Sequence, residues 1–587
     1  MKCYRENYPR PQLVRDNWQS LNGEWRFRFD QEDVGEREGW NKGFHSPHTI
    51  TVPFTFETVA SGIHREEPCS VIWYARESEL SALAENERLM LHFEGSDYHT
   101  KVWINGQFAG EHQGGYARFS MEIGNLCREG SNRIVVRVCD YSDAGQARGK
   151  QRWTAQNYGC WYVQTTGIWK TVWLERTPEV YIKQLKMTPN LQEYKLIIEA
   201  LIEAGDRKGY TLEAKAGYQD IPAGNVSACI RGRRIRVELD LYNTQIDEWG
   251  VKLWSPQSPE LYDIELCICR DGKIIDRVGS YFGMREISIK GSRVLLNNAP
   301  LYQKLILDQG YWTDTHLTPP DEQALIFDIE CALKLGYNGV RKHQKIEDER
   351  YLYWCDVKGL LVWSEMAAAY TFHDTAVEGF TREWMEILQQ NYNHPCIITW
   401  VPFNESWGIP HVRTRPDQQA FTQAVYHLTK AFDTMRPVIV NDGWEHTISD
   451  IITLHDYQES GEAFLEKYTD RLSEILESRI PHSDYRFAFA DSFGYRGQPI
   501  MISEYGGIAF STKDGWGYGK QVASEDSFIE RFRSITEAIQ QIPQISGYCY
   551  TQLTHVQQEQ NGLMDEKRRM IADPDTIAEI NRKRKEY

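Results

Sequence analysis

The chain has 587 residues, of which 41% are apolar and 25% charged, and its formal net charge is −17. One hydrophobic core rarely organises so long a chain, so we expect two to four domains. The excess of acidic residues argues against a nucleic-acid surface, which needs a basic stripe, and against binding to anionic membranes. A small anionic substrate stays compatible with this charge, because a basic pocket can lie within an acidic protein.

The amino-terminal segment, residues 1–18, lacks the apolar run of a signal peptide. No stretch approaches the ~20 apolar residues that a membrane-spanning helix needs. The 12 cysteines are scattered and form no C-x-x-C pair, so a disulfide framework is not expected. These features predict a cytoplasmic protein, although an exported chain whose signal had been removed would look similar.

Residues 1–178 and 179–287 have the pattern of two successive β-sandwiches. In the first, short alternating segments such as GEWRFRF and NRIVVRVCD are separated by Gly, Asn and Asp, which is typical of a jelly roll. The second contains KLIIEALIEA and RIRVELDL, and its length suits an immunoglobulin-like sandwich.

Residues 288–587 have a different pattern, in which apolar runs alternate with helical stretches such as 321–336 and 526–542. The predicted strands are 302–308, 338–343, 359–365, 396–405, 437–442, 451–457, 499–505 and 545–552. Eight strands with helical connections indicate a (β/α)8 barrel. The predicted fold class is therefore multidomain β and α/β: jelly roll, immunoglobulin-like sandwich, then barrel.

Two glutamates lie where such barrels place their chemistry, at the carboxyl ends of strands. Glu405 ends the fourth predicted strand and Glu504 the seventh, each directly after an apolar run. Most glutamates are solvated surface charges, but burying one costs several kcal/mol unless it is paired or functional. Retaining glycoside hydrolysis needs two carboxyl groups ~5–5.5 Å apart, which two strands of one barrel can supply.

Several segments resemble glycoside hydrolase family 2. NYNHPCIITWVPFNESWG (391–408) is similar to the acid/base strand of that family, and QPIMISEYGG (498–507) to its nucleophile strand. WQSLNGEWRFRFD and TTGIWKTVWLE resemble its amino-terminal sugar-binding jelly roll, and FGMREI resembles the end of its immunoglobulin-like domain. The resemblance covers nearly the whole chain and keeps the family's domain order.

This resemblance implies roles for four residues. Glu405 would be the general acid and then the general base, and Glu504 the nucleophile. Asn404 would donate to the sugar 2-OH, and Arg341 would hold the nucleophile charged and oriented. A structural ion pair is the alternative for Arg341. The chemistry needs no metal or cofactor, and the spacing of the histidines identifies no metal site.

Other residues near the predicted barrel mouth are candidates for substrate contact. Tyr457 and Tyr505 could orient the nucleophile through their hydroxyls. Sugar rings stack on aromatic side chains, which makes Trp312 and Trp407 candidates, with core packing as the alternative. Asp308, in the same loop as Trp312, could accept hydrogen bonds from sugar hydroxyls.

The identity of the sugar is the least determined point. In the family's glucuronidases, an Asn-x-Lys motif binds the uronate carboxylate, but here Leu563 follows Asn561 where that lysine would stand. Arg341, Lys342 and Lys345 cluster after the second strand and could bind a carboxylate instead. The alternative is that Arg341 serves the nucleophile while the lysines are solvated.

We therefore expect an exo-β-glycosidase for galacto-configured substrates, with β-galacturonides slightly ahead of β-galactosides. The alternatives are a β-glucuronidase or another family 2 exo-glycosidase, a transglycosylase using the same glutamates, and a non-catalytic carbohydrate-binding protein. The last should have lost a catalytic carboxylate, and both are present. A carbohydrate is the expected partner. Members of the family are often dimers or tetramers, so a homo-oligomer is also possible for this chain.

Overall fold

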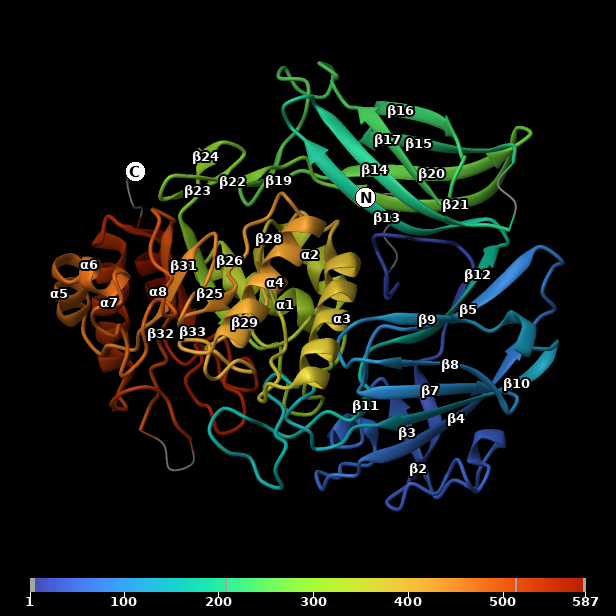
Figure 1. The fold of residues 1–587 in the computed structure, drawn as a ribbon, viewed down its shortest axis with the longest axis horizontal. Coiled ribbons are helices and arrows are strands. Elements are labelled where there is room, and N and C mark those ends of the chain that lie inside the picture. The colour runs from blue at the N-terminus through green and yellow to red at the C-terminus, as the bar shows by residue number, and fades with distance from the viewer. Residues whose placement is uncertain (1–5, 206–207, 512–514, 584–587) are drawn as a thin grey trace.

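The computed structural model describes residues 6–205, 208–511 and 515–583, which form two β-sandwiches and a helix-covered barrel (Figure 1). The jelly roll, in blue, and the second sandwich, in green, lie side by side along one flank of the barrel (Figure 1). The predicted fold class is confirmed. None of the helices in the described ranges has the length and apolar character needed to cross a bilayer.

The jelly roll packs a four-stranded antiparallel sheet on a six-stranded one. Alternation sets the faces: in β2, Trp25 and Phe27 are buried whereas Arg26 is exposed. Phe27 meets Leu91 of the other sheet in a shared core. The sheets are β1 (Trp18–Ser20), β12 (Val172–Pro178), β5 (Glu87–Phe93), β9 (Phe119–Glu122), and β3 (His48–Val52), β2 (Gly23–Phe29), β4 (Val71–Leu80), β10 (Gly130–Cys139), β7 (His99–Ile104), β8 (Gln107–Gln113), with a separate pair β6 (Ser96–Asp97) and β11 (Gly167–Ile168).

The second sandwich packs a three-stranded sheet on a four-stranded one. Its sheets are β13 (Tyr181–Asn190), β14 (Lys195–Glu203), β17 (Arg234–Asp240), and β16 (Ile221–Cys229), β15 (Tyr210–Tyr218), β20 (Tyr262–Arg270), β21 (Lys273–Phe282). The pair β18 (Trp254–Ser255) and β19 (Ser258–Pro259) precedes β20, and a small meander of β22 (Ile287–Lys290), β23 (Arg293–Leu296) and β24 (Ala299–Pro300) leads into the barrel. The predicted boundary at 287/288 falls within β22.

The barrel is built from parallel strands whose two faces are both buried, which is why they read as nearly continuous apolar runs. All five residues of β28 are at most 1% exposed. The strands are β25 (Gln303–Asp308), β26 (Gly339–Lys342), β27 (Leu361–Glu365), β28 (Ile397–Val401) with β29 (Phe403–Asn404), β30 (Asn441–Asp442), β31 (Ile452–His455), β32 (Ile500–Gly506) and β33 (Ile545–Thr551). The helices are α1 (Glu322–Lys334), α2 (Glu349–Lys358), α3 (Asp374–Asn391), α4 (Pro416–Phe432), α5 (Gly461–Asp470), α6 (Leu472–Leu476), α7 (Glu525–Gln541) and α8 (Pro574–Arg582).

The fifth strand is less regular than predicted. Residues 437–442 pair with the fourth strand through a parallel bridge between Trp400 and Val438, and β30 pairs with β29. On the side of the sixth strand, the Val438 N–H donates to the Asp450 carboxylate at 2.9 Å. A side chain thus takes the position that a backbone carbonyl oxygen of a neighbouring strand would have in a regular sheet. The connection 443–451 carries no helix, because a helical crossover needs roughly a dozen residues or more.

The second sandwich contacts the base of the barrel, where the strands begin. Arg285, which is 2% exposed, donates to the carbonyl oxygens of Pro395 at 2.9 Å and Ile397 at 3.0 Å. The Trp254 indole N–H donates to the Asp356 carbonyl oxygen at 2.8 Å. These contacts fix the start of β28, the strand that leads to Glu405.

Replacing Arg285 with Met should lower the melting temperature measured by calorimetry. The change removes the donor of the buried Pro395 carbonyl oxygen, at a cost of about 1–3 kcal/mol, whereas the Ile397 carbonyl oxygen keeps the Arg436 donor at 2.6 Å. Arg277→Met is the control, because Arg277 is exposed and lies 3.6 Å from Glu265 in a surface ion pair of little energetic value. Equal melting temperatures for the two variants would contradict the role of Arg285.

Candidate active site

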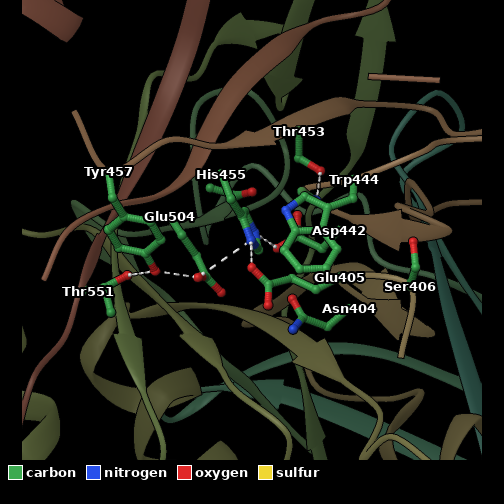
Figure 2. A network of polar contacts seen from close by, with 12 residues as sticks. Asn404, Glu405, Ser406, Asp442, Trp444, Thr453, His455, Tyr457, Glu504 and Thr551 are labelled. Atoms are coloured by element: carbon green, nitrogen blue, oxygen red, sulfur yellow. Dashed lines mark hydrogen bonds and ion pairs between the residues drawn. The ribbon is translucent and has the colours of Figure 1, made fainter. Parts of the chain in front are cut away.

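Charged side chains gather at the carboxyl ends of the barrel strands. Asp442 ends β30, His455 ends β31, Glu504 lies within β32 and Glu405 directly follows β29. Figure 2 shows His455 facing both glutamates, with Tyr457 reaching Glu504 from the opposite side. Residues separated by up to a hundred positions therefore form one polar cluster.

The two predicted catalytic glutamates lie close together. A carboxylate oxygen of Glu405 is within 4.8 Å of one of Glu504. The backbone of Glu405 has a φ of 50°, a left-handed conformation that costs a non-glycine residue about 1–2 kcal/mol. Its N–H donates to the Asp442 carbonyl oxygen at 2.9 Å, which holds this conformation in place. Backbone strain of this kind is typical of functional sites.

Arg341, on β26, is fully buried and contacts three carboxylates. Its guanidinium nitrogens lie 2.6 Å from Glu504, 2.7 Å from Glu365 and 3.0 Å from Asp442. It also donates to the side-chain oxygen of Asn404. An unpaired buried charge would cost several kcal/mol, so these contacts fix side chains from four other strands around one cation.

His455 joins the same cluster. Its Nδ1 lies 2.7 Å from Glu405 and 3.4 Å from Glu504, and its Nε2 lies 3.0 Å from Asp442. Burial disfavours a charged ring, but the carboxylate of Glu504 and the hydrogen bonds to Asp442 and Glu405 outweigh it and raise the pKa of His455 to about 10. The ring is therefore a cation that donates to its neighbours. The sequence contained a signal for this role, since His455 lies near the carboxyl end of the predicted strand 451–457.

The two glutamates have opposite pKa shifts. Burial works to raise both values. For Glu504, the positive charges of His455 and Arg341 outweigh burial and lower the pKa to about 2. For Glu405, burial and the negative charge of Glu504 raise the pKa, against the hydrogen bond from His455. Glu504 is thus ionised at neutral pH, and Glu405 is the carboxyl that retains a proton to higher pH.

Two groups in the described ranges have a spacing that could hold a metal ion: Glu405, His455 and Glu504, and Asp356, His394 and Cys396. In the first group, the raised pKa keeps His455 protonated, and an imidazolium has no lone pair for a metal. In the second, Asp356 lies 2.6 Å from His394 Nδ1 and accepts a hydrogen bond from the Cys396 N–H at 2.8 Å. Each group is therefore held by contacts among its own members and their neighbours.

Comparison with known proteins agrees with this architecture. Residues 18–178 match the sugar binding domain of glycosyl hydrolases family 2, residues 180–285 match the family's second domain, and residues 287–524 match its TIM barrel domain. The chain belongs to glycosyl hydrolase family 2. The resemblance seen in the sequence is confirmed.

Individual family 2 members are distant in sequence. A β-galactosidase of Vibrio cholerae is 24% identical over 74% of this chain and 44% of its own length. A β-glucuronidase structure from an uncultured Clostridium has a TM-score of 0.78 at 18% identity, covering 98% of this chain and 99% of its own. A family 2 β-galacturonidase structure from Eisenbergiella tayi has a TM-score of 0.76 at 19% identity, covering 98% of both chains. The chain spans about half the length of several curated relatives that it matches.

The two predicted orienting tyrosines have different positions. The Tyr457 hydroxyl donates to Glu504. Tyr505 points to the other side of β32, where its hydroxyl lies 2.9 Å from the Thr536 hydroxyl on α7. The prediction that Tyr505 orients the nucleophile is wrong, because neighbours on a strand face opposite sides and Glu504 faces the site.

Asp308 and Lys342 pair with each other instead of lining the site. Lys342 Nζ lies 2.8 Å from Asp308 and 2.7 Å from Glu347, and all three side chains are at most 2% exposed. Lys345 Nζ lies 2.9 Å from the same Glu347 and donates to the Gly310 carbonyl oxygen. Because these charges neutralise one another, the predictions that Lys342 binds a sugar carboxylate and that Asp308 binds sugar hydroxyls are wrong.

Trp312 is part of the barrel core and is 7% exposed. Lys345 Nζ lies 5.1 Å from its ring centre and the Arg568 guanidinium carbon 5.0 Å. The indole is thus occupied by cation–π contacts within the protein. The prediction that Trp312 stacks on a sugar is wrong for this reason.

Trp407 is half-buried at the barrel mouth. Its ring centre lies 5.6 Å from that of Tyr370 and 5.7 Å from that of Trp161. Trp161 and its neighbour Lys150 belong to the jelly-roll loop, residues 141–166, between β10 and β11. Sequence reasoning missed both residues, because no local motif indicates which loop of one domain covers the mouth of another.

A recess of about 600 Å³ opens beside Glu405. Its walls include Trp444, Tyr457, Tyr518 and the segment 481–484. The rings of Tyr457 and Tyr518 stack with their centres 3.4 Å apart, which forms one apolar wall next to the charged cluster. Ligand sites commonly combine such walls with a few polar groups.

Tyr457→Phe should lower kcat/KM for a nitrophenyl glycoside by about 10- to 100-fold, because a hydrogen bond to a charged group is worth about 1.5–3 kcal/mol. Tyr505→Phe removes the same hydroxyl from the next strand and should leave kcat/KM within about twofold. The comparison needs only steady-state rates of the two variants. A similar loss in both would contradict the assignment of Tyr457 to Glu504.

Proposed function

We propose that this protein is a retaining exo-β-glycosidase that hydrolyses terminal non-reducing β-D-hexopyranosides. The observation that carries the proposal is the close approach of the Glu405 and Glu504 carboxylates, whose oxygens come within 4.8 Å. Retaining enzymes hold their two carboxyl groups ~5–5.5 Å apart, whereas inverting enzymes need ~6.5–9.5 Å to admit a water molecule. The shifted pKa values support Glu504 as the nucleophile and Glu405 as the acid.

In the first step, a Glu504 oxygen attacks the anomeric carbon while the bond from that carbon to the leaving oxygen breaks. Glu405 gives its proton to the leaving oxygen, and a glycosyl ester forms on Glu504. Arg341 and Tyr457 each contact a different oxygen of Glu504. They hold the carboxylate ionised and aimed before the attack.

The second step needs Glu405 to act as a base. Part of its raised pKa comes from the negative charge of Glu504. Esterification of Glu504 removes that charge, so the pKa of Glu405 falls and the hydrogen bond from His455 favours the ionised form. Glu405 then takes a proton from water, whose oxygen attacks the anomeric carbon and releases Glu504 with retained configuration.

Asn404 is suited to bind the sugar 2-OH. Its side-chain oxygen accepts a hydrogen bond from Arg341, which turns the amide N–H₂ away from that residue. The amide nitrogen is buried and has no hydrogen-bond partner among the described residues. A substrate hydroxyl would satisfy this donor, and such a contact strengthens in the transition state.

For the sugar, we propose a galacto-configured substrate, with β-galacturonides ahead of β-galactosides. Leu563 is fully buried where the resemblance to glucuronidases would place a lysine. Asn561 donates to Glu559 and accepts from Gln552, so it is bound within the protein. A β-glucuronidase stays the second candidate, because solved structures with this fold include enzymes of that name.

Glu405→Ala should slow phenyl glycosides by about 10²–10⁴-fold, the usual contribution of a general acid, and dinitrophenyl glycosides much less. Activated phenolates leave without a proton, so the leaving group separates acid catalysis from misfolding. Glu504→Gln should abolish turnover of both, and proton NMR of wild-type product should show the β-anomer first. Equal losses on both leaving groups, or an initial α-anomer, would sink the mechanism.

His455→Gln should move both limbs of the kcat/KM–pH profile to higher pH, by about one unit. The acid limb reports ionisation of Glu504, whose pKa is lowered by the His455 charge and rises without it. The basic limb reports deprotonation of Glu405, whose pKa is also lowered by His455. His555→Gln, which changes a histidine without contact to either glutamate, should leave both limbs in place. A limb that moves to lower pH would refute the assignment.

A further inference from the structure

The jelly-roll loop, residues 141–166, brings side chains of the first domain to the barrel mouth. In Figure 1 it is the cyan connection that runs from the jelly roll along the lower edge of the barrel. The N–H groups of Arg148 and Gly149 donate to the Ala368 carbonyl oxygen at 2.9 and 3.0 Å. The Tyr370 hydroxyl donates to the Gly149 carbonyl oxygen. The loop is thus fixed to the segment that follows β27.

Gly149 permits this close approach. Its φ is +60°, and a Cβ at this position would lie 2.3 Å from the Gln344 carbonyl oxygen. Any larger residue would push the loop away from the barrel. Because Lys150 directly follows, its backbone is positioned by this close contact between the two domains.

The Lys150 side chain faces the catalytic residues. Its Nζ lies 5.1 Å from the ring centre of Trp407, two residues after Glu405. The side chain is half-buried, and within the described ranges no carboxylate lies at ion-pair distance from its ammonium. A cation placed against an aromatic ring, with no carboxylate at ion-pair distance, is available for an anionic ligand.

The neighbouring cations are committed elsewhere. Arg341 contacts three carboxylates, Lys342 contacts two, and Lys345 lies against Glu347. His455 is shared between Glu405 and Asp442. Of the cations considered for substrate binding, Lys150 alone keeps its charge without such a partner in the described part of the chain.

Lys150 stays charged in this setting. Burial works to lower its pKa, but the thiol of Cys160 and the carboxylates of Glu559 and Glu504 outweigh burial and raise the pKa above its ordinary value. Lys150 in turn acts to lower the pKa of Glu405. The ammonium is therefore close enough to both catalytic carboxylates for their charges to interact.

We propose that Lys150 selects the glycone by binding a carboxylate at C6 of the sugar, which makes uronides the substrate class. This inference rests on the proposed function, which places the anomeric carbon between Glu405 and Glu504. The C6 group belongs to the same sugar ring, next to the ring oxygen, and so remains near that carbon. A cation that interacts with both glutamates lies within reach of C6.

The test compares nitrophenyl β-galacturonide, β-glucuronide and β-galactoside, which share one leaving group, in the wild type and in Lys150→Met. The Met side chain keeps the apolar stem and removes the charge. We expect the ratio of kcat/KM for the favoured uronide to kcat/KM for the galactoside to fall about 10- to 100-fold. Lys150→Arg keeps the charge and should retain the uronide preference.

Lys101→Met is the matched control, since it removes a surface charge from the same domain, where Lys101 pairs with Glu36. Equal losses on uronide and galactoside in Lys150→Met would overturn the inference, as would a wild type that prefers the neutral sugar. Both outcomes leave the two-glutamate mechanism standing, which Glu504→Gln tests separately.

Binding gives a second readout that needs no turnover. Calorimetric titration of Glu504→Gln with D-galacturonate, D-glucuronate and D-galactose should show tighter binding of one of the acids. Adding Lys150→Met to that variant should remove the difference. If the acids bind no more tightly than galactose, or if the difference survives loss of Lys150, the inference is wrong even where no nitrophenyl glycoside is cleaved. If carboxyphenyl β-galactoside were cleaved faster than phenyl β-galactoside and Lys150→Met removed that difference, the bound carboxylate would lie on the leaving group, and the inference would be wrong.

Discussion

The buried guanidinium of Arg341 holds the catalytic end of the barrel together. It is fully shielded from solvent and neutralised by Glu365, Asp442 and Glu504, each from a different strand. Removing the guanidinium would leave three buried carboxylates without their shared counter-charge, which costs several kcal/mol. The guanidinium also keeps Glu504 ionised, and it donates to the Asn404 side-chain oxygen, which directs the amide nitrogen of Asn404 away from Arg341. Stability of the mouth and readiness for chemistry thus depend on one interaction.

The two sandwiches act on opposite ends of the barrel. The second sandwich contacts the base, where Arg285 caps the carbonyl oxygens at the start of β28. The jelly roll sends its loop to the mouth, where Gly149 and Ala368 meet. A barrel alone would keep its glutamates but lose the loop that carries Lys150. The two sandwiches therefore have different structural roles: one supports the start of the strands, and the other brings a loop to the barrel mouth.

Sequence reasoning succeeded where a pattern is local. Apolar runs ending in a carboxylate located Glu405 and Glu504, and the strand ends agree with the structure to within a few residues. Tyr505 could have been excluded by alternation, since its neighbour Glu504 must face the site. The pairing of Lys342 with Asp308 and Glu347 needed three-dimensional contacts, because charge alone does not say which partner a lysine finds. Lys150 lies some 250 residues before Glu405 in the sequence, and its placement depends on domain packing that no periodicity encodes.

The left-handed backbone of Glu405 has a consequence for how such a chain can change over time. A glycine at this position would adopt the same φ of 50° without steric cost. Burial of the carboxyl group would also disappear, together with its repulsion from Glu504. Such a change would relieve the backbone strain and remove a buried carboxyl group, while giving up the contact between Glu405 and His455 at 2.7 Å. The glutamate thus carries a conformational cost that its proposed role as acid and base would explain.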